Sequence, residues 1–354
     1  MQHKAWIDVI TPKEALLFSR VSRGLEERGW DILVTTRDYE ETVQLLEMEG
    51  LDYVKVGSHG ETLVEKLRQS LYRMEKLAEL VVRKRPGVVI CLTSPDACRV
   101  AFGLKIPIIC LHDTVHADKV ARLTLPLSTY VVVPEAIPLN SVTKYGVNPG
   151  RVVRYRGVDA VAWIRDFNPS EGVLKELGLK RGEPIVVLRP LEEKSSYMLE
   201  AGGKAQVDVV VDEALRHGAK VVIFPRYGYQ REYVRRKYGG NPNVVIPSRA
   251  VDSRSLMYYA SLTVCQGGTM GIESALLGTP TVVYLPVGGL CISWLAGKGF
   301  PIYLTSGVDQ LKLYVGRILE NPRAYRVDTS RLLSQLEDPV EKIVRLAEVC
   351  VKGG

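Results

Sequence analysis

Short apolar runs alternate with longer amphipathic stretches along almost the whole chain of 354 residues. The runs are rich in Val and Ile, as buried strands of parallel sheets are, and the stretches between them carry apolar residues at helical spacing. The expected strands are residues 6–10, 31–36, 53–56, 88–92, 106–111, 130–133 and 152–155, then 185–188, 220–224, 243–246, 262–265, 281–284 and 302–304. This alternation predicts an α/β fold with doubly wound parallel sheets covered by helices.

A polar segment with a proline, Asn168-Pro169-Ser170, divides these strands into two series. A chain of this length exceeds what one hydrophobic core usually organises, so two domains are expected. We predict a first Rossmann-like domain over residues 1–160 and a second over residues 161–338. A terminal helix is expected within residues 339–354.

The composition indicates an ordinary globular protein. With 46% hydrophobic and 25% charged residues, the chain resembles an ordinary globular protein. The N-terminus leads almost at once into a strand that contains a charge, and every long apolar run is broken by Gly, Pro or a charged residue. These features argue against a signal peptide or a membrane span and predict a cytoplasmic protein.

A net charge of +7 favours an anionic partner. Basic clusters are modest and no nucleic-acid-binding motif is present, so no specific nucleic-acid partner is expected. A nucleotide sugar and the anionic inner face of a membrane, contacted peripherally, both fit the charge. The sequence leaves the oligomeric state open.

The six cysteines form no Cys-x-x-Cys pair and have no ligand-like partnership with histidine. Several lie within apolar, strand-like runs. We therefore expect reduced, buried thiols that act as small hydrophobic residues, and no metal site.

The most informative motif spans residues 265–280. It reads as the end of a strand, a turn with Gly267 and Gly268, a short helix and the start of another strand. Glycines let the backbone approach a phosphate closely, and a helix that begins near Thr269, with that threonine as its cap, would add N–H groups and a positive dipole end. Glu273, one helical turn later, suits a ribose diol. The alternative is a turn without ligand, needed only for close packing of helix on sheet.

In the first domain, two histidines and two aspartates occur within residues 112–118, directly after an apolar strand. Strand ends are where α/β sheets place their ligands. We predict His116 as a general base and Asp113 as the carboxylate that orients it. Helix capping or structural hydrogen bonding, and metal binding, are the alternatives for His116. Glu135 follows the next strand and is a further catalytic candidate, unless it is an acidic residue at a helix N-terminus.

Two arginines follow strands of the second domain. Arg189 is suited to hold a diphosphate with its planar guanidinium, and Arg226 repeats the arrangement one unit later. Ser195 and Ser196 would add hydroxyl donors. The alternatives are a surface salt bridge and a flexible loop without ligand.

Gly-Gly-Thr followed by Glu-Ser and Gly-Thr-Pro, within residues 267–280, resembles the nucleotide-sugar motif of GT-B-fold glycosyltransferases. It is similar to the N-acetylglucosaminyltransferases of peptidoglycan synthesis and to the non-hydrolysing UDP-N-acetylglucosamine 2-epimerases. Together with residues 113–117, 122–127, 134–138 and 188–190, it also resembles a mainly archaeal family of unknown function, numbered 354, of the GT-B superfamily. That resemblance implies two Rossmann-like domains with parallel sheets facing across a substrate cleft, and a last helix that returns to the first domain.

The resemblance predicts a metal-independent glycosyltransferase whose donor, a nucleotide-diphosphate sugar with UDP as the expected nucleotide, is a substrate and not a cofactor. Its acceptor would be a glycan, a lipid-linked sugar or a small molecule. The first alternative is a non-hydrolysing nucleotide-sugar 2-epimerase, with acid and base groups among His112, Asp113, His116 and Glu135. The second is a nucleotide-binding protein of the same fold without catalysis. The expected ligand contacts are Gly267, Gly268 and Thr269 with the diphosphate, Glu273 with the ribose, and Arg189, Ser195, Ser196 and Arg226 with the leaving group.

Overall fold

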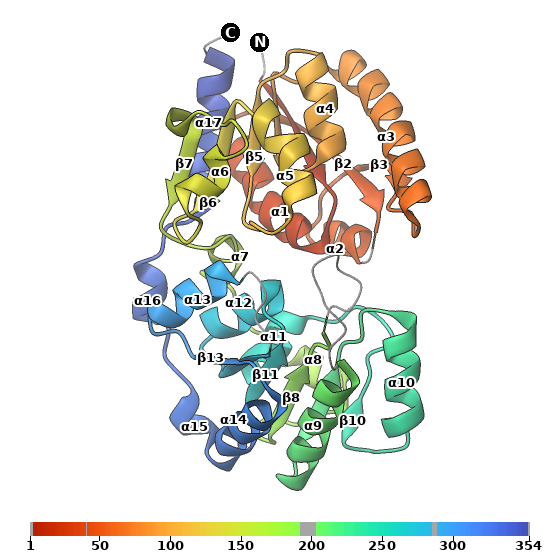
Figure 1. The fold of residues 1–354 in the computed structure, drawn as a ribbon, viewed down its shortest axis with the longest axis vertical. Coiled ribbons are helices and arrows are strands. Elements are labelled where there is room, and N and C mark those ends of the chain that lie inside the picture. Colours follow the sequence, from red (N-terminus) through yellow and green to blue (C-terminus); the bar gives the residue numbers. More distant parts are fainter. Residues whose placement is uncertain (1–2, 40, 192–202, 285–288, 353–354) are drawn as a thin grey trace. The chain divides into compact units, whose positions relative to one another are not determined.

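The structure is a computed structural model that describes residues 3–39, 41–191, 203–284 and 289–352. The chain divides into two compact units. Unit 1 comprises residues 1–163 and 336–354, and unit 2 comprises residues 164–335. Each unit is built around one parallel β-sheet with helices on both faces (Figure 1).

Unit 1 holds a seven-stranded parallel sheet in the order β3-β2-β1-β4-β5-β6-β7. Helix α1 packs against α2 and α17, whereas α4 packs against α3 and α5. The strands are β1 (Lys4–Val9), β2 (Asp31–Asp38), β3 (Val54–Ser58), β4 (Val88–Leu92), β5 (Ile108–Leu111), β6 (Tyr130–Pro134) and β7 (Val152–Tyr155). The helices are α1 (Pro12–Glu26), α2 (Thr42–Met48), α3 (Leu63–Lys84), α4 (Pro95–Gly103), α5 (Asp118–Thr124), α6 (Leu139–Thr143) and α17 (Pro339–Lys352), with 3-10 turns η1 (Leu125–Leu127) and η2 (Pro149–Arg151).

Unit 2 holds a six-stranded parallel sheet in the order β10-β9-β8-β11-β12-β13. The strands are β8 (Ile185–Leu188), β9 (Lys220–Ile223), β10 (Val244–Val245), β11 (Leu262–Cys265), β12 (Thr281–Tyr284) and β13 (Ile302–Thr305). The helices are α8 (Gly172–Glu176), α9 (Gly203–Arg216), α10 (Gly228–Tyr238), α11 (Ser253–Tyr259), α12 (Gly268–Leu276), α13 (Leu290–Gly297), α14 (Val308–Glu320), α15 (Pro322–Tyr325) and α16 (Ser330–Ser334), and α7 (Val161–Ile164) spans the boundary between the units.

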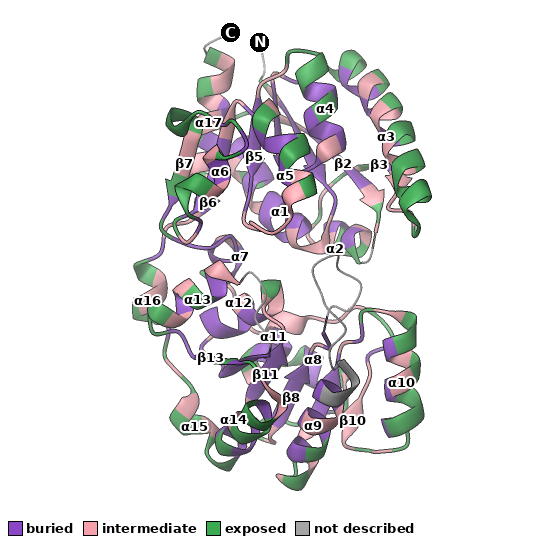
Figure 2. Cartoon of the chain, in the orientation of Figure 1, coloured by how far each residue is buried: buried purple, intermediate pink, exposed green. Residues whose placement is uncertain are grey.

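Both faces of the unit 2 sheet are buried, which explains why its strands read as unbroken apolar runs. In β8, Val186 and Leu188 join a core cluster that includes side chains of α9 and α14. Ile185 and Val187 point to the opposite face and join a second cluster with side chains of α8 and α11. Figure 2 shows the same pattern as buried strands between helices that are exposed on their outer sides.

The last helix belongs to unit 1. Glu341 of α17 pairs with Arg28 at 2.8 Å, and a Cβ at Gly24 of α1 would lie 3.3 Å from Val344 of α17. Lys342 donates to the carbonyl of Arg154 at 2.7 Å. The chain therefore leaves unit 1, forms unit 2 and comes back to complete unit 1.

The predicted α/β class with two parallel sheets is confirmed. Strands β4, β7, β8, β11 and β12 have the predicted bounds residue for residue. The expected strand over residues 243–246 shrinks to the two residues of β10. Among the described strands, β10 pairs only with β9, so backbone hydrogen bonds to a neighbouring strand fix only a short part of the expected strand.

Gly278, near the end of the motif of residues 265–280, has a backbone conformation that only glycine adopts easily. Its φ is +80°, and a Cβ there would lie 2.1 Å from the carbonyl oxygen of Val327. We expect Gly278→Ala to lower the free energy of unfolding by about 2 kcal/mol or more, from backbone strain and the steric clash.

Urea titration followed by circular dichroism measures this loss. Gly297→Ala is the matched control, because a Cβ at that helical position meets no described atom within 4 Å. A Gly278→Ala protein as stable as the control would contradict the structure of this turn.

Candidate functional site

The candidate site residues of unit 1 follow the carboxyl ends of three strands. Lys13 lies in the first turn of α1, directly after β1, and Asp113 follows β5. Asp159 follows β7. Because the sheet is parallel, these strand ends lie along one edge, where α/β proteins bind ligands.

Lys13 joins two carboxylates at this edge. Its Nζ forms ion pairs with Asp113 Oδ2 and Asp159 Oδ2, and the Tyr155 hydroxyl donates to Asp159 Oδ1. The Lys13 side chain is 18% exposed. Burial alone would lower the pKa of Lys13, but the two carboxylates outweigh burial and raise it. Lys13 is therefore a fixed ammonium cation.

The same contacts keep Asp113 ionised. Burial would raise its pKa, but the charge of Lys13 and a hydrogen bond from the Thr114 hydroxyl at 2.8 Å lower it overall. Asp113 is thus a permanent carboxylate with a fixed orientation, as an orienting group requires.

His116 lies on the loop between β5 and α5 and is partly buried. Burial lowers its pKa below 6.5, and the nearby carboxylate of Asp113 opposes part of that decrease. The imidazole is therefore neutral at pH 7 and able to accept a proton. Asp113 is close enough to act on His116 electrostatically, and its role in orienting His116 stays a prediction.

Two alternatives for the predicted catalytic residues do not fit the structure. The N-cap of α5 is Ala117, with no side-chain cap hydrogen bond, so His116 does not cap that helix. Glu135 is exposed directly after β6, but the next helix, α6, begins four residues later and has no acidic residue in its first turn. Glu135 is therefore not a helix-terminal acid.

His112 differs sharply from His116. It is 2% exposed, its Nε2 has no hydrogen-bond partner among the described residues, and burial lowers its pKa. A residue so enclosed is poorly placed to exchange a proton with a substrate.

A buried polar cluster lies around the ends of β1 and β4. Arg73 of α3 is 1% exposed and forms a bidentate pair with Asp8, with contacts of 2.6 and 3.2 Å. It also pairs with Asp96 at 3.2 Å and donates through Nε to the carbonyl of Val56 at 3.0 Å. We refer to Asp8, Arg73 and Asp96 as the Arg73 cluster.

Glu14, next to Lys13 in α1, is fully buried. Burial raises its pKa to about 8, although hydrogen bonds from the Ile10 N–H and the Thr11 hydroxyl, each 2.8 Å long, favour the charged form. The folded protein thus holds a proton on Glu14 that the unfolded chain loses near pH 4.5. Between these values the folded state binds more protons, so the contribution of Glu14 to stability falls as pH rises and levels off above about pH 8.

Between pH 5.5 and 7 the stability lost through Glu14 should be about 2 kcal/mol, since one proton is worth about 1.4 kcal/mol per pH unit. Glu14→Gln keeps an acceptor for the Ile10 N–H and should abolish this slope. Urea titrations at both pH values measure it, with the exposed Glu26→Gln of the same helix as the control. Equal slopes in the two variants would disprove the assignment.

In unit 2 the glycine-rich segment has the predicted strand, turn, helix and strand. Strand β11 leads into α12, which is followed by β12. The cap prediction is wrong: the N-cap is Gly267, and no described side chain caps the helix. Gly267 and Gly268 have φ values of +111° and +66°, so the turn is tighter than expected and Thr269 falls inside the first helical turn.

The glycines of this segment serve different purposes. A Cβ at Gly271 would lie 2.8 Å from Cys265 Sγ, so that glycine is needed for close packing of α12 on β11. A Cβ at Gly268 would meet no described atom within 4 Å. Close packing accounts for Gly271 and positive φ for Gly267 and Gly268, and the space in front of Gly268 leaves room for a ligand.

Arg189 follows β8, which lies next to β11 in the sheet, and Arg226 follows β9, one strand further along. Arg189 Nη1 donates to the carbonyl of Phe224 at 3.0 Å, so its guanidinium lies at the carboxyl end of β9. Arg226 is exposed. The structure thus brings both arginines to the sheet edge that carries Gly267 and Gly268.

The remaining predicted ligand contacts are Glu273, Ser195 and Ser196. Glu273 is 3% exposed, one turn into α12, and its contact with a ribose stays a prediction. Ser195 and Ser196 lie outside the described residues.

Sequence reasoning missed Lys13, Tyr155 and Asp159. Lys13 could have been found, because it follows the first strand as Asp113 follows the fifth. Asp159 follows β7 after an irregular segment, and nothing in the sequence indicates that it meets Lys13.

The family model described as "Protein of unknown function (DUF354)" matches residues 3–351. The chain belongs to this family. An uncharacterized protein of Methanocaldococcus jannaschii is 32% identical over 288 residues, which cover 79% of this chain and 81% of that one. A lipid-A-disaccharide synthase of Solibacter usitatus is 35% identical over 247 residues, which cover 63% of this chain and 58% of the synthase.

Solved structures confirm the GT-B-like fold of this DUF354 member. The UDP-GlcNAc 2-epimerase of Methanocaldococcus jannaschii, solved with UDP-GlcNAc and UDP, has a TM-score of 0.72 at 16% identity, covering 98% of this chain and 99% of that one. Spinosyn forosaminyltransferase SpnP has a TM-score of 0.65 at 14% identity, covering 99% and 100%.

Across the part of the chain that the structure describes, we find no helix with the length and apolar character required to cross a membrane.

Proposed function

We propose that this protein is a metal-independent glycosyltransferase that uses a nucleotide-diphosphate sugar, with UDP as the nucleotide. The observation that carries the proposal is the end of the unit 2 sheet, where an uncapped helix N-terminus, two positive-φ glycines and two arginines meet along one edge. Free N–H groups and guanidinium groups are the donors that a diphosphate requires.

In this proposal the N–H groups around Gly267, Gly268 and Thr269 bind the diphosphate. Arg189 and Arg226 offset the charge that develops on the leaving nucleotide as the glycosidic bond breaks. Glu273 accepts hydrogen bonds from the ribose. Full burial of that carboxylate would strengthen these bonds, since the local dielectric is low.

Unit 1 supplies the acceptor side. His116 removes the proton of the acceptor hydroxyl, and Asp113 stabilises the resulting imidazolium. Lys13 is a positioning residue, because its ammonium group is already neutralised by Asp113 and Asp159. It fixes Asp113 and leaves no spare charge for a phosphate.

A 2-epimerase is the alternative enzyme, and a nucleotide-binding protein without catalysis is the third possibility. An epimerase needs acid and base groups on both faces of a sugar. His112 is enclosed and Asp113 is a fixed carboxylate, whereas His116 is the histidine of this loop with a suitable pKa and partial exposure. Exposed Glu135 is the remaining candidate for the second group that an epimerase needs. The sequence match to a lipid-A-disaccharide synthase favours transfer to a hydroxyl acceptor.

The acceptor class is a glycan, a lipid-linked sugar or a small molecule, and we place the reaction in the cytoplasm. A lipid-linked acceptor would bring the protein to the anionic inner face of a membrane, which a net charge of +7 would favour.

The activity is tested by UDP release from UDP-sugars, with and without a panel of acceptors and in the presence of EDTA. The proposal expects acceptor-dependent release that EDTA does not abolish. Conversion of UDP-N-acetylglucosamine to its 2-epimer without acceptor would replace it with the epimerase. Tight nucleotide binding without turnover across the panel would favour the non-catalytic alternative.

The donor site is tested by Gly268→Trp. We expect the indole to fill the space in front of the turn and to weaken UDP binding about 100-fold or more, because it blocks the backbone N–H groups. Gly268→Asn is the matched control, since asparagine tolerates positive φ and is small. Isothermal titration measures both affinities, and UDP binding by Gly268→Trp equal to that of the control would refute the donor site. Glu273→Ala, titrated in the same way, tests the ribose contact.

A further inference from the structure

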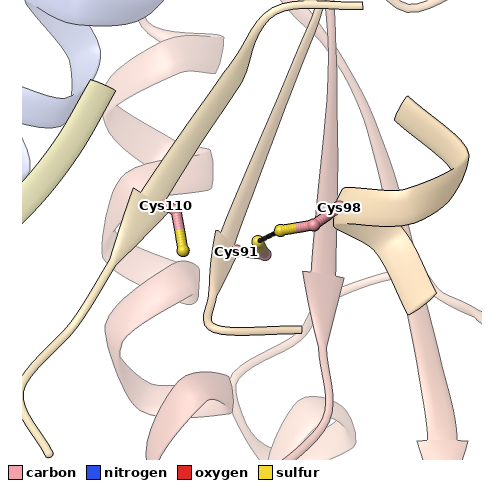
Figure 3. Close-up of side chains that lie close together, drawn as sticks. All are labelled: Cys91, Cys98 and Cys110. Atoms are coloured by element: carbon pink, nitrogen blue, oxygen red, sulfur yellow. Dashed lines mark hydrogen bonds between the residues drawn. The ribbon is translucent and has the colours of Figure 1, made fainter. Parts of the chain in front are cut away.

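Three cysteine thiols meet in the core of unit 1. Cys91 of β4 and Cys110 of β5 are paired in the register of the two neighbouring strands, and Cys98 faces them from α4 (Figure 3). All three are buried and reduced. Their sulfur atoms lie within 4.8 Å of one another, and the sulfurs of Cys91 and Cys98 are 3.5 Å apart.

These separations match a metal centre with three sulfur ligands. Metal–thiolate bonds are about 2.3 Å long, so three sulfurs in a plane around one ion lie about 4 Å apart. The 3.5 Å between the sulfurs of Cys91 and Cys98 and the limit of 4.8 Å on all three separations are compatible with that value. Movements of less than about 1 Å would therefore complete the site, and small rotations of the side chains supply them.

The backbone around the thiols offers N–H donors to two of the sulfur atoms. The N–H of Thr93 interacts with Cys110, and the N–H of Ser94 with Cys91. Thr93 has a φ of +46°, which is unusual for a β-branched residue and costs on the order of 1 kcal/mol or more. Such N–H donors to sulfur are typical of the surroundings of thiolate ligands.

We propose that Cys91, Cys98 and Cys110 bind one Cu(I) ion in a three-coordinate thiolate site. Thiolates prefer soft ions such as Cu(I), whereas structural zinc takes four ligands, and the described residues offer three. Binding forms three copper–sulfur bonds and releases the protons of the three thiols. The copper stays Cu(I), so no electron is transferred.

Because the thiols are enclosed, the ion enters while unit 1 folds or opens locally. A bound ion joins β4, α4 and β5 and stabilises the folded state by mass action. The proposal is independent of the glycosyltransferase, since none of the three thiols belongs to the proposed donor or acceptor site.

The test uses the full chain, unfolded and refolded without oxygen in the presence of the acetonitrile complex of Cu(I), and then challenged with bicinchoninate. We expect one Cu(I) per chain to survive the challenge and the melting temperature to rise. Cys98→Ser and Cys110→Ser should each weaken Cu(I) binding about 100-fold or more, because even loss of an outer partner costs about 10- to 100-fold. Cys265→Ser, which removes a buried thiol of unit 2, should leave binding unchanged.

Circular dichroism of each variant without copper shows whether it folds, so that loss of binding is scored only for folded protein. If Cys98→Ser does not fold, Cys110→Ala replaces it. Copper retained equally by the cluster variants and by Cys265→Ser overturns the site, as does absence of bound copper in the parent protein. Retention of Zn²⁺ with rejection of Cu(I) overturns the choice of metal.

Discussion

Replacing Arg73 with Met is expected to lower the free energy of unfolding by about 3–5 kcal/mol, the cost of breaking a buried ion pair from one side. The guanidinium is 1% exposed and neutralises Asp8, which is fully buried, and Asp96, which is 6% exposed. Methionine fills much of the volume but offers no charge and no N–H. Two carboxylates then stay buried without their cation.

The rest of the cluster cannot replace that cation. Asp8 accepts hydrogen bonds of 2.6 Å from the hydroxyls of Thr35 and Ser94, and Asp96 accepts one of 2.5 Å from Ser70. Hydroxyl groups stabilise a carboxylate but do not neutralise it. Burial raises the pKa of Asp8, and Arg73 reverses this so that the net shift is downward.

The dependence on pH separates this explanation from a simple loss of packing. In the parent protein the pKa of Asp8 is depressed, so the stability from its ion pair is present above about pH 4 and is lost as pH falls through the folded value. Without Arg73 the buried carboxyl of Asp8 should take up a proton well above pH 4, because burial raises its pKa. The difference in stability between parent and variant should therefore shrink as pH falls from 7 toward 4.

Urea titrations at pH 7 and pH 4.5 measure both effects. Arg83→Met, an exposed arginine near the end of the same helix, should change stability by less than about 0.5 kcal/mol. Adding Asp8→Asn to Arg73→Met should recover part of the loss, since it removes one of the unpaired charges. A loss of stability equal to that of Arg83→Met, or one independent of pH, would contradict the role given to Arg73.

The sequence predicts the sheets well because their signal is local. Each buried strand is a run of Val, Ile and Leu bounded by polar residues, and β4, β8 and β11 have the bounds expected from that pattern. Short helices were harder to predict. Helices such as α6, α8 and α15 span only four or five residues, too few for apolar residues to recur at helical spacing.

The sequence predicts candidate site residues only where they directly follow a strand. Asp113, Arg189 and Gly267 each follow an apolar run, so the general rule for parallel sheets locates them. Contacts between distant segments do not show in a sequence. The pairing of Lys13 with Asp159 and the meeting of Cys91 with Cys98 and Cys110 depend on strand order and register, which periodicity does not reveal.

The predicted cap of α12 illustrates a different limit. Thr269 is a good capping residue, and the sequence pattern favours it. In the structure the positive φ of Gly267 and Gly268 starts the helix earlier, so Gly267 takes the cap position. The Gly267 N–H donates to Cys265 Sγ at 3.4 Å, and no described side chain caps the N–H groups of the first turn of α12.

His116→Ala is expected to reduce turnover by about 10²- to 10⁴-fold, the usual contribution of a general base. UDP affinity should stay the same, because the nucleotide contacts of the proposal lie in unit 2. Burial lowers the pKa of His116 below 6.5, so the parent rate should be constant near pH 7 and fall only below pH 6.5, as the imidazole gains a proton. The variant should lack this acidic decrease.

Asp113→Asn gives the sharper test of this arrangement. The carboxylate of Asp113 raises the pKa of His116 against the effect of burial, so its removal should move the acidic decrease to still lower pH. A merely structural role for Asp113 would reduce the rate without shifting the profile. His217→Ala, which removes a partly buried histidine of unit 2, serves as the control. If His116→Ala keeps full turnover, or still shows the acidic decrease at the same pH, another group is the base. Exposed Glu135 is then the first residue to replace.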